Sequence, residues 1–300
     1  MSIRTSYRST GSEGLDYNCP PMRLWAKAKQ LGVWNPADID FSQDAEDWKK
    51  LNADEKDQLL RTTSLFMAGE EAVTVDLLPL IQTVAEEGRL EEEIYLTSFL
   101  WEEAKHVDAF HTFLTEVVQE RPDLMRYHSP AYRQIFEDEL PSSLSALRTD
   151  RSPEAQARAS TTYNLIVEGV LAETGYHSYH KMLVENGIMP GMRTVVGHLK
   201  RDESRHLAYG VFLLSRLVAE HGDRVWNVIE SRMQELLGPA VAVVDESYQD
   251  YEVVPFGIVP QEMAAFAEAQ FSHRIARIQK AREQSLAEVY GTADYELVPA

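Results

Sequence analysis

The sequence predicts an all-α protein whose core is a four-helix bundle, with additional helices around it. Apolar residues recur with helical periodicity over most of the chain, and no alternating strand pattern competes with them. A Glu followed by Glu-x-x-His occurs twice at nearly the same spacing, which is the ligand arrangement of a carboxylate-bridged dimetal centre in such a bundle. The two copies are Glu70 with Glu103 and His106, and Glu168 with Glu203 and His206.

The chain is expected to form one domain, because the two copies of the pattern must share one core. Residues 1–50 contain scattered Gly and Pro and predict an irregular segment that packs on the bundle. Residues 51–290 form the single helical domain. Residues 291–300 are expected to be a frayed tail.

The first two helices are predicted from caps and from proline. Asn52 with Glu55 resembles a capping box, which begins a long helix that ends near Gly88. A second helix begins near Leu90 and ends before Pro122.

Proline and glycine also set the boundaries of the next two helices. A third follows Pro130 and is expected to kink or break at Pro141. Ser152 and Pro153 begin a fourth, with Ser as N-cap and Pro in the first turn, and Gly187 ends it.

The last three helices follow the same reasoning. Pro190 begins a fifth helix, and Gly222 separates it from a sixth that ends near Ala242. A final helix is predicted from Pro260 to about Tyr290.

Each candidate ligand lies within an apolar stripe of its predicted helix, as Glu70 does between Phe66 and Val73. An isolated buried carboxylate costs tens of kcal/mol in an idealised medium of low dielectric constant, at roughly ε of 4. Divalent cations resolve this cost, and carboxylate oxygen with imidazole nitrogen suits Mn and Fe. The i, i+3 spacing of Glu and His places both on one helical face, so both reach one cavity.

Residues near the candidate ligands receive plainer interpretations. Glu71 and Glu102 lie off the apolar stripes and are expected to be solvated. Asp202 either accepts the ring N–H of a ligand histidine or is a charge on the helix surface. Three other histidines are not expected to bind metal, namely His177, His180 and His198. Three phenylalanines are expected to belong to the core, namely Phe99, Phe110 and Phe113.

Composition limits the class of protein. The formal net charge of −19 argues against nucleic acid as a partner, because a phosphate backbone needs Lys and Arg to replace its counterions. Cys19 is the single cysteine, so an intrachain disulfide is impossible. The polar N-terminal stretch lacks the apolar core of a secretory signal, and no apolar run of about 18 residues predicts a membrane span. These features predict a soluble cytoplasmic protein.

Longer segments resemble the ligand-binding oxidases that look like ribonucleotide reductase small subunits, within the ferritin-like dimetal-carboxylate superfamily. The resemblance covers about residues 35–215 and is carried by NPADIDFSQDAEDW (35–48), AGEEAVTVDLLP (68–79), EEAKHVDAF (102–110), YNLIVEG (163–169), GYHSYHK (175–181) and DESRH (202–206).

The resemblance implies a ferritin-like fold, a heterodinuclear Mn/Fe cofactor and dioxygen as oxidant, with a di-iron centre as the alternative. By position, Glu70, Glu103 and His106 match the manganese site, and the second copy matches the iron site. It also implies a bound long-chain fatty acid and an ether cross-link between Tyr163 and Val73. Because Tyr163 is five residues before Glu168, a local π-bulge is expected to bring both to one face.

Other functions of the same ligand set stay open. A ribonucleotide reductase small subunit usually carries a radical tyrosine where this chain has Phe110. A fatty-acyl desaturase fits the ligands, but its acidic carrier protein would be repelled by the net negative charge. Ferritin subunits are usually shorter. Helical-bundle relatives are often dimers, so we expect a homodimer.

Overall fold

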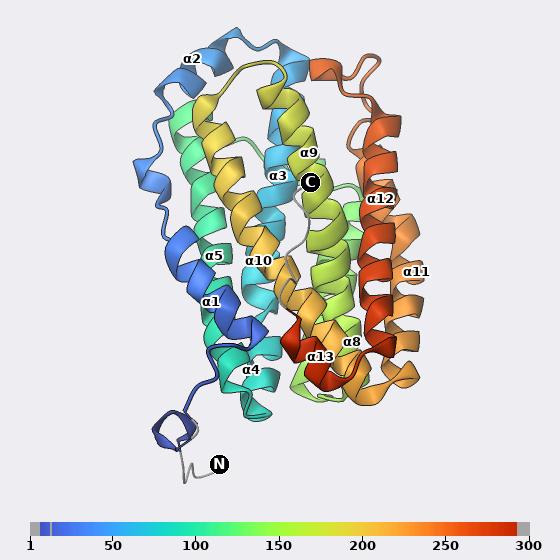
Figure 1. The fold of residues 1–300 in the computed structure, drawn as a ribbon. Helices are drawn as coiled ribbons and strands as arrows, with labels where there is room; N and C mark the ends of the chain where they lie inside the picture. Colours follow the sequence, from blue (N-terminus) through green and yellow to red (C-terminus); the bar gives the residue numbers. More distant parts are fainter. Residues whose placement is uncertain (1–6, 13, 293–300) are drawn as a thin grey trace.

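Four helical segments lie side by side at the centre of the protein, and each carries part of the acidic pattern (Figure 1). They are α3 (Ala53–Asp76), α5 (Leu90–Phe113), α10 (Pro190–His221), and the π-helix Thr161–Ala172 that continues α8 (Pro153–Ser160). The structure, a computed structural model, describes residues 7–12 and 14–292, and these contain no strand. The all-α bundle is therefore confirmed.

The predicted caps are formed. The Asn52 side chain accepts the Glu55 N–H at 3.0 Å, and the Glu55 carboxylate accepts the Asn52 N–H at 2.8 Å. The Ser152 hydroxyl accepts the Ala155 N–H at the start of α8. These side chains satisfy backbone donors that have no partner inside the helix.

The first helix is shorter than expected. It ends at Asp76, and a separate helix, α4 (Leu78–Glu86), follows after Leu77. Pro79 lies in the first turn of α4, where a missing N–H costs nothing, whereas inside a longer helix it would remove a hydrogen bond. The prediction of one helix to Gly88 is wrong for this reason.

The last predicted helix is also interrupted. The chain forms α12 (Pro260–Gln279), a 3₁₀ turn, and then α13 (Leu286–Gly291). Ser285 caps α13 through a second capping box, which starts a new helix instead of continuing the old one. Most of the expected frayed tail, residues 293–300, lies outside the described residues.

The middle of the chain follows its prolines and glycines. Helix α6 (Pro130–Arg133) continues through a π-helical turn into α7 (Leu140–Ser145), so the chain changes helix type beside Pro141 instead of breaking there. Gly222 has a φ of 65°, a conformation that favours glycine, and it separates α10 from α11 (Asp223–Glu246).

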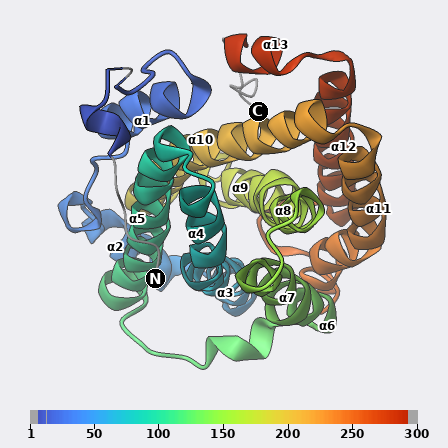
Figure 2. The same ribbon diagram turned by 90° about the horizontal axis from the view of Figure 1, so that it is seen from below.

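The first fifty residues are not irregular throughout. They contain α1 (Pro20–Leu31) and α2 (Ser42–Lys50). Proline in the first turn and a buried apolar face stabilise α1, which packs against α5 and α10 (Figure 2). The loop that follows α1 carries Trp34 to these two helices, where its indole N–H donates a hydrogen bond to Asp202 of α10.

The π-helix Thr161–Ala172 is the expected π-bulge in extended form. Wider π-helical turns shift the register, and the side chains of Tyr163 and Glu168 line the same cavity. Helices α11 and α12 pack against the π-helix (Figure 2). Among the described residues, every helix is too short or too polar to cross a lipid bilayer.

Candidate metal centre

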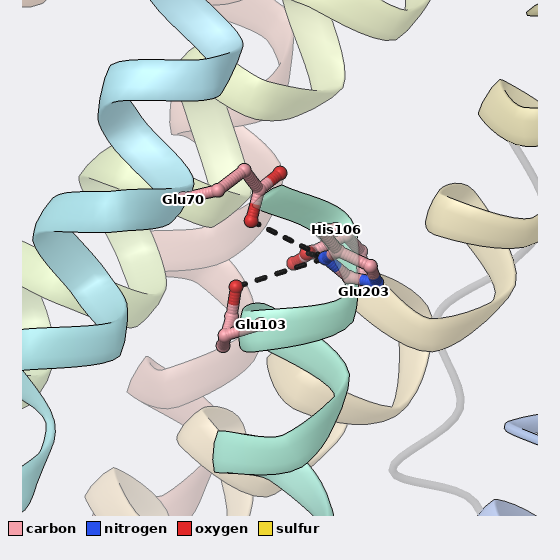
Figure 3. A group of neighbouring side chains, drawn as sticks. All are labelled: Glu70, Glu103, His106 and Glu203. Atoms are coloured by element: carbon pink, nitrogen blue, oxygen red, sulfur yellow. Dashed lines mark hydrogen bonds and ion pairs between the residues drawn. The ribbon is translucent and has the colours of Figure 1, made fainter. Parts of the chain in front are cut away.

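The six predicted ligand residues meet at one buried point in the bundle. None is more than 6% exposed, and both histidines are fully buried. Their donor atoms form two overlapping groups, each of which could hold one cation with all atoms within 4.8 Å of one another. One group is Glu70, Glu103, His106 and Glu203, drawn in Figure 3, and the other is Glu103, Glu168, Glu203 and His206.

Glu103 and Glu203 belong to both groups because each turns one oxygen toward each histidine. Glu103 Oε2 lies 3.7 Å from His106 Nδ1, and Glu103 Oε1 lies 3.1 Å from His206 Nδ1. Glu203 Oε1 lies 3.4 Å from His106 Nδ1, and Glu203 Oε2 lies 3.5 Å from His206 Nδ1. This arrangement would let each of the two carboxylates serve both cations of a pair.

Glu70 and Glu168 occupy opposite ends of the cluster. Glu70 Oε2 lies 3.2 Å from His106 Nδ1, and Glu168 Oε1 lies 4.0 Å from His206 Nδ1. The Asn164 amide donates to the other oxygen of Glu168 at 2.9 Å. Each end of the cluster thus has one carboxylate and one imidazole of its own.

The cluster fits a pair of divalent cations. Four buried atoms that face its interior have no hydrogen-bond partner within the described structure, namely Glu103 Oε2, Glu168 Oε1, Glu203 Oε2 and His206 Nδ1. Buried polar atoms without partners are rare and call for an unseen ligand or ion. The charges agree with this. The four ligand glutamates are joined by the buried Glu102 and Asp202, and the buried cations beside them are Lys105 and Arg205. Six negative charges against two positive charges leave four, which two divalent cations would balance.

Each histidine is held on its outer side by an acid from the facing helix. His106, on α5, donates from Nε2 to Asp202 of α10 at 3.2 Å. His206, on α10, donates from Nε2 to Glu102 of α5 at 2.8 Å. Such contacts fix the tautomer of a ligand histidine and leave Nδ1 free to face a cation. Of the two interpretations of Asp202, the structure supports the hydrogen-bonded one.

The expectation that Glu102 is solvated is wrong. Glu102 is fully buried, and the Arg205 guanidinium bridges it to Asp202 at 2.6 and 2.5 Å. The reason is tertiary packing, because the face of α5 that carries Glu102 is covered by α10 and by the backbone of Gly32. The sequence signal for Glu102 and Asp202 is a repeated pattern of acid, Glu, any residue, cation and His. It occurs as EEAKH at 102–106 and as DESRH at 202–206.

The other residues near the centre behave largely as expected. Glu71 is exposed and Phe110 is fully buried. Phe99 is also core, but its ring stacks on His206 with a centroid separation of 3.7 Å and so fixes that ring. His177 stacks on Phe266.

An apolar cavity leads to the cluster. Apolar side chains of α3, the π-helix and α11 form most of its wall, and Glu70, Glu103, Glu168 and Glu203 lie on its lining. Val73 and Tyr163 line it too, and the Tyr163 hydroxyl donates to Glu103 Oε1 at 2.9 Å. Lys, Arg and His are absent from the described lining, so a bound anion would need cations at the cluster.

We expect metal binding to release protons. Burial raises the pKa of Glu70 and of Glu168. Burial alone would lower the pKa of His106 and His206, but Glu70 beside the first and Glu203 beside the second raise it well above its usual value. Protons held by these groups must leave before a cation binds, so affinity for Mn²⁺ should rise with pH.

Calorimetric Mn²⁺ titrations between about pH 6 and pH 8, in buffers of different ionisation enthalpy, measure this release. The stability of the metal-free protein should change in the opposite direction and fall as pH rises. Raised pKa values contribute stability that is complete below the unfolded-state pKa and is lost as pH rises through the folded-state pKa. An Mn²⁺ affinity that does not change with pH would contradict the expected protonation.

The family model for "Ribonucleotide reductase, small chain" matches residues 16–281. An R2-like ligand-binding oxidase from Sulfolobus acidocaldarius is 42% identical, with a TM-score of 0.87, and the match covers 96% of this chain and 99% of that one.

Two mutant structures of an R2-like ligand-binding oxidase match as well. A Gly-to-Leu mutant with an anaerobically reconstituted Mn/Fe cofactor is 36% identical, with a TM-score of 0.87, over 92% of this chain and 98% of that one. A Tyr-to-Phe mutant with an aerobically reconstituted Mn/Fe cofactor is 34% identical, with a TM-score of 0.88, over 92% and 99%. Their cofactor agrees in kind with the carboxylate and imidazole cluster found here.

Proposed function

Because this chain belongs to the ribonucleotide reductase small-chain family, and within it to the R2-like ligand-binding oxidases, we propose that it is a dioxygen-dependent Mn/Fe oxidase that acts on C–H bonds. The observation that carries the proposal is the pair Glu103 and Glu203, each of which faces both histidines at the end of an apolar cavity. The enzyme is an oxidoreductase whether its centre holds Mn and Fe or two Fe.

In this proposal Glu70 and His106 would hold manganese, Glu168 and His206 would hold iron, and Glu103 and Glu203 would serve both metals. The cofactor, when bound, reduces dioxygen with electrons taken from the metals and from a C–H bond. The protein holds the ligands in a dry site and places the bond to be oxidised beside them. A di-iron centre remains the alternative, because carboxylate and imidazole ligands suit both metals.

The cavity supports a long-chain fatty acid, or a similar lipid, as the ligand. Its wall is mainly apolar, and residues such as Leu65, Leu171 and Val243 would bury an alkyl chain. Since the described lining offers no cationic side chain, the carboxylate of such a ligand would bind at the metals. This orientation places carbon atoms of the chain beside the oxidising centre.

We further propose that the centre joins Val73 to Tyr163 by an ether bond. The Tyr163 oxygen bonds to Val73 Cβ, the phenolic O–H and the Cβ–H are lost, and the two electrons and two protons go to dioxygen. Both residues line the cavity, and the phenol already donates to the bridging Glu103. The tertiary Cβ–H of valine is weaker than a methyl C–H, which favours it as the hydrogen that is removed.

We expect protein loaded with Mn²⁺ and Fe²⁺ without oxygen, and then exposed to air, to lose two hydrogens between the peptides that contain Val73 and Tyr163. Tandem mass spectrometry of a protease digest detects the linked peptides. Tyr163→Phe and Val73→Ala are the controls that should remain unlinked with both metals bound. Fully loaded protein that yields only separate peptides after exposure to air would rule out the cross-link.

The ribonucleotide reductase family model also favours a second function, a radical-generating small subunit. Phe110 is fully buried and packs on Phe66, at the position where such subunits usually carry a radical tyrosine. Nucleotide reduction on mixing with a catalytic large subunit would support this function over the first. The homodimer and the cytoplasmic location remain predictions.

A further inference from the structure

The two metal positions have the same protein ligands. Each has one glutamate and one histidine of its own, together with the shared Glu103 and Glu203. Identical donor atoms do not distinguish manganese from iron, because selectivity between such metals comes from geometry and ligand character. A difference between the positions must therefore arise in the residues around the ligands, including those that hold the two histidines.

The acid that holds His106 is crowded with donors. Asp202 Oδ2 accepts the Trp34 indole N–H at 2.8 Å, and the Lys105 ammonium lies 3.1 Å from the same oxygen. Arg205 donates to Asp202 Oδ1 at 2.5 Å. His106, at 3.2 Å, has the longest of these contacts. Three other donors thus compete with His106 for one carboxylate.

The acid that holds His206 has fewer donors. Within the described residues Glu102 accepts from Arg205 at 2.6 Å and from His206 at 2.8 Å. The Gly32 backbone closes over Glu102, so that a Cβ at this position would overlap the carboxylate. Lys105 donates to the carbonyl of Gly32 at 2.6 Å and pairs with Asp202 at 3.1 Å. The pseudo-symmetric halves of the site therefore differ in these outer contacts.

We propose that Trp34 and Lys105, by donating to Asp202, make His106 the weaker nitrogen ligand and thereby favour manganese over iron at the Glu70/His106 position. The inference rests on the proposed dimetal function. Trp34 and Lys105 act through Asp202 and are positioning residues. The loop after α1 thus takes part in metal selection.

The chemical reason is the strength of the imidazole donor. A carboxylate that accepts the ring N–H of a histidine raises the basicity of the other ring nitrogen. Each additional donor to that carboxylate reduces this effect, since its negative charge is shared. Affinity rises from Mn²⁺ to Fe²⁺ at nitrogen and oxygen sites, and imidazole suits iron while carboxylate suits manganese. A weaker imidazole therefore lowers the affinity of the position for iron more than its affinity for manganese.

The test is Trp34→Phe, which removes the indole N–H but keeps an aromatic ring against His198, on which Trp34 stacks at 4.8 Å. Metal-free protein is loaded anaerobically with equal amounts of Mn²⁺ and Fe²⁺. Anomalous diffraction at the Mn and Fe absorption edges then gives the occupancy of each position. We expect the Fe:Mn ratio at Glu70/His106 to rise roughly threefold, near the lower end of the effect of one net hydrogen bond, with little change at Glu168/His206.

Trp101→Phe is the matched control. Trp101 is exposed and lies over the same Lys105 ammonium at 4.4 Å, while the donors to Asp202 are other residues. Lys105→Met is the second variant and should move the ratio in the same direction as Trp34→Phe, so the test does not depend on one variant folding.

The outcomes separate the two proposals. A parent protein that fails to bind two metals would overturn the proposed function. A parent that binds two metals, with ratios in Trp34→Phe and Lys105→Met equal to those of the parent or shifted equally at both positions, would overturn the selectivity inference alone.

Discussion

Glu203→Ala is expected to abolish binding of both metals. One oxygen of Glu203 faces His106 and the other faces His206, so under the proposed assignment its removal would delete a ligand from each position. The loss of affinity should exceed the roughly 10- to 100-fold cost of removing a partner of a metal ligand. Metal content after anaerobic loading and desalting, measured by plasma mass spectrometry, checks it.

The matched control for this experiment is Glu71→Ala. Glu71 is next to a ligand residue on α3 but is exposed, so its loss should leave two metals per chain. Metal-free Glu203→Ala should remain folded, because the change removes one of several buried carboxylates that repel one another. A variant that retains one tightly bound metal would show that Glu203 serves a single position and would contradict the bridging geometry.

The metal centre could be predicted from sequence because its ligands repeat at helical spacing. The apolar stripes around Glu70 and Glu103 required that something compensate their charges, and this requirement does not depend on the three-dimensional structure. The proposed role of Glu103 and Glu203 at both metal positions did depend on the three-dimensional structure. Sequence position assigned Glu103 to one metal and Glu203 to the other, whereas the bundle brings the two carboxylates between the histidines.

The residues around the ligands were harder to predict. Glu102 is off the apolar stripe of α5, and only the packing of α10 and the Gly32 backbone against that face buries it. Trp34 is far from the ligands in sequence and reaches Asp202 through a loop. Contacts of this kind depend on tertiary packing, which helical periodicity does not encode.

The helix boundaries show a similar division. Local signals such as the Asn52 and Ser152 caps were sufficient, because the chemistry of a cap lies within a few residues. Pro79 was a local signal too, and its position in the first turn of α4 explains why the long helix is divided. The π-helix was predicted only because Tyr163 and Glu168 had to share a face.

Arg205→Met is expected to destabilise the metal-free protein by roughly 3–5 kcal/mol, the typical cost of removing one partner from a buried ion pair. Arg205 is 3% exposed and bridges Glu102 to Asp202, which are both fully buried. Without the guanidinium, Asp202 keeps Lys105, Trp34 and His106 beside one of its oxygens. Glu102 keeps His206 as its donor but loses its cationic partner. Urea denaturation followed by circular dichroism gives the free energy of unfolding.

Arg201→Met is the control, because Arg201 is exposed one turn earlier on α10 and its loss should change stability by no more than about 0.5 kcal/mol. Adding Glu102→Gln to Arg205→Met should recover part of the loss, since one of the two carboxylates that lost the guanidinium is then neutral. Arg205→Met with the stability of the parent would show that the outer acids do not need this cation. If the loss occurs and the double variant recovers stability, the guanidinium acts mainly by balancing the buried acids that hold both histidines.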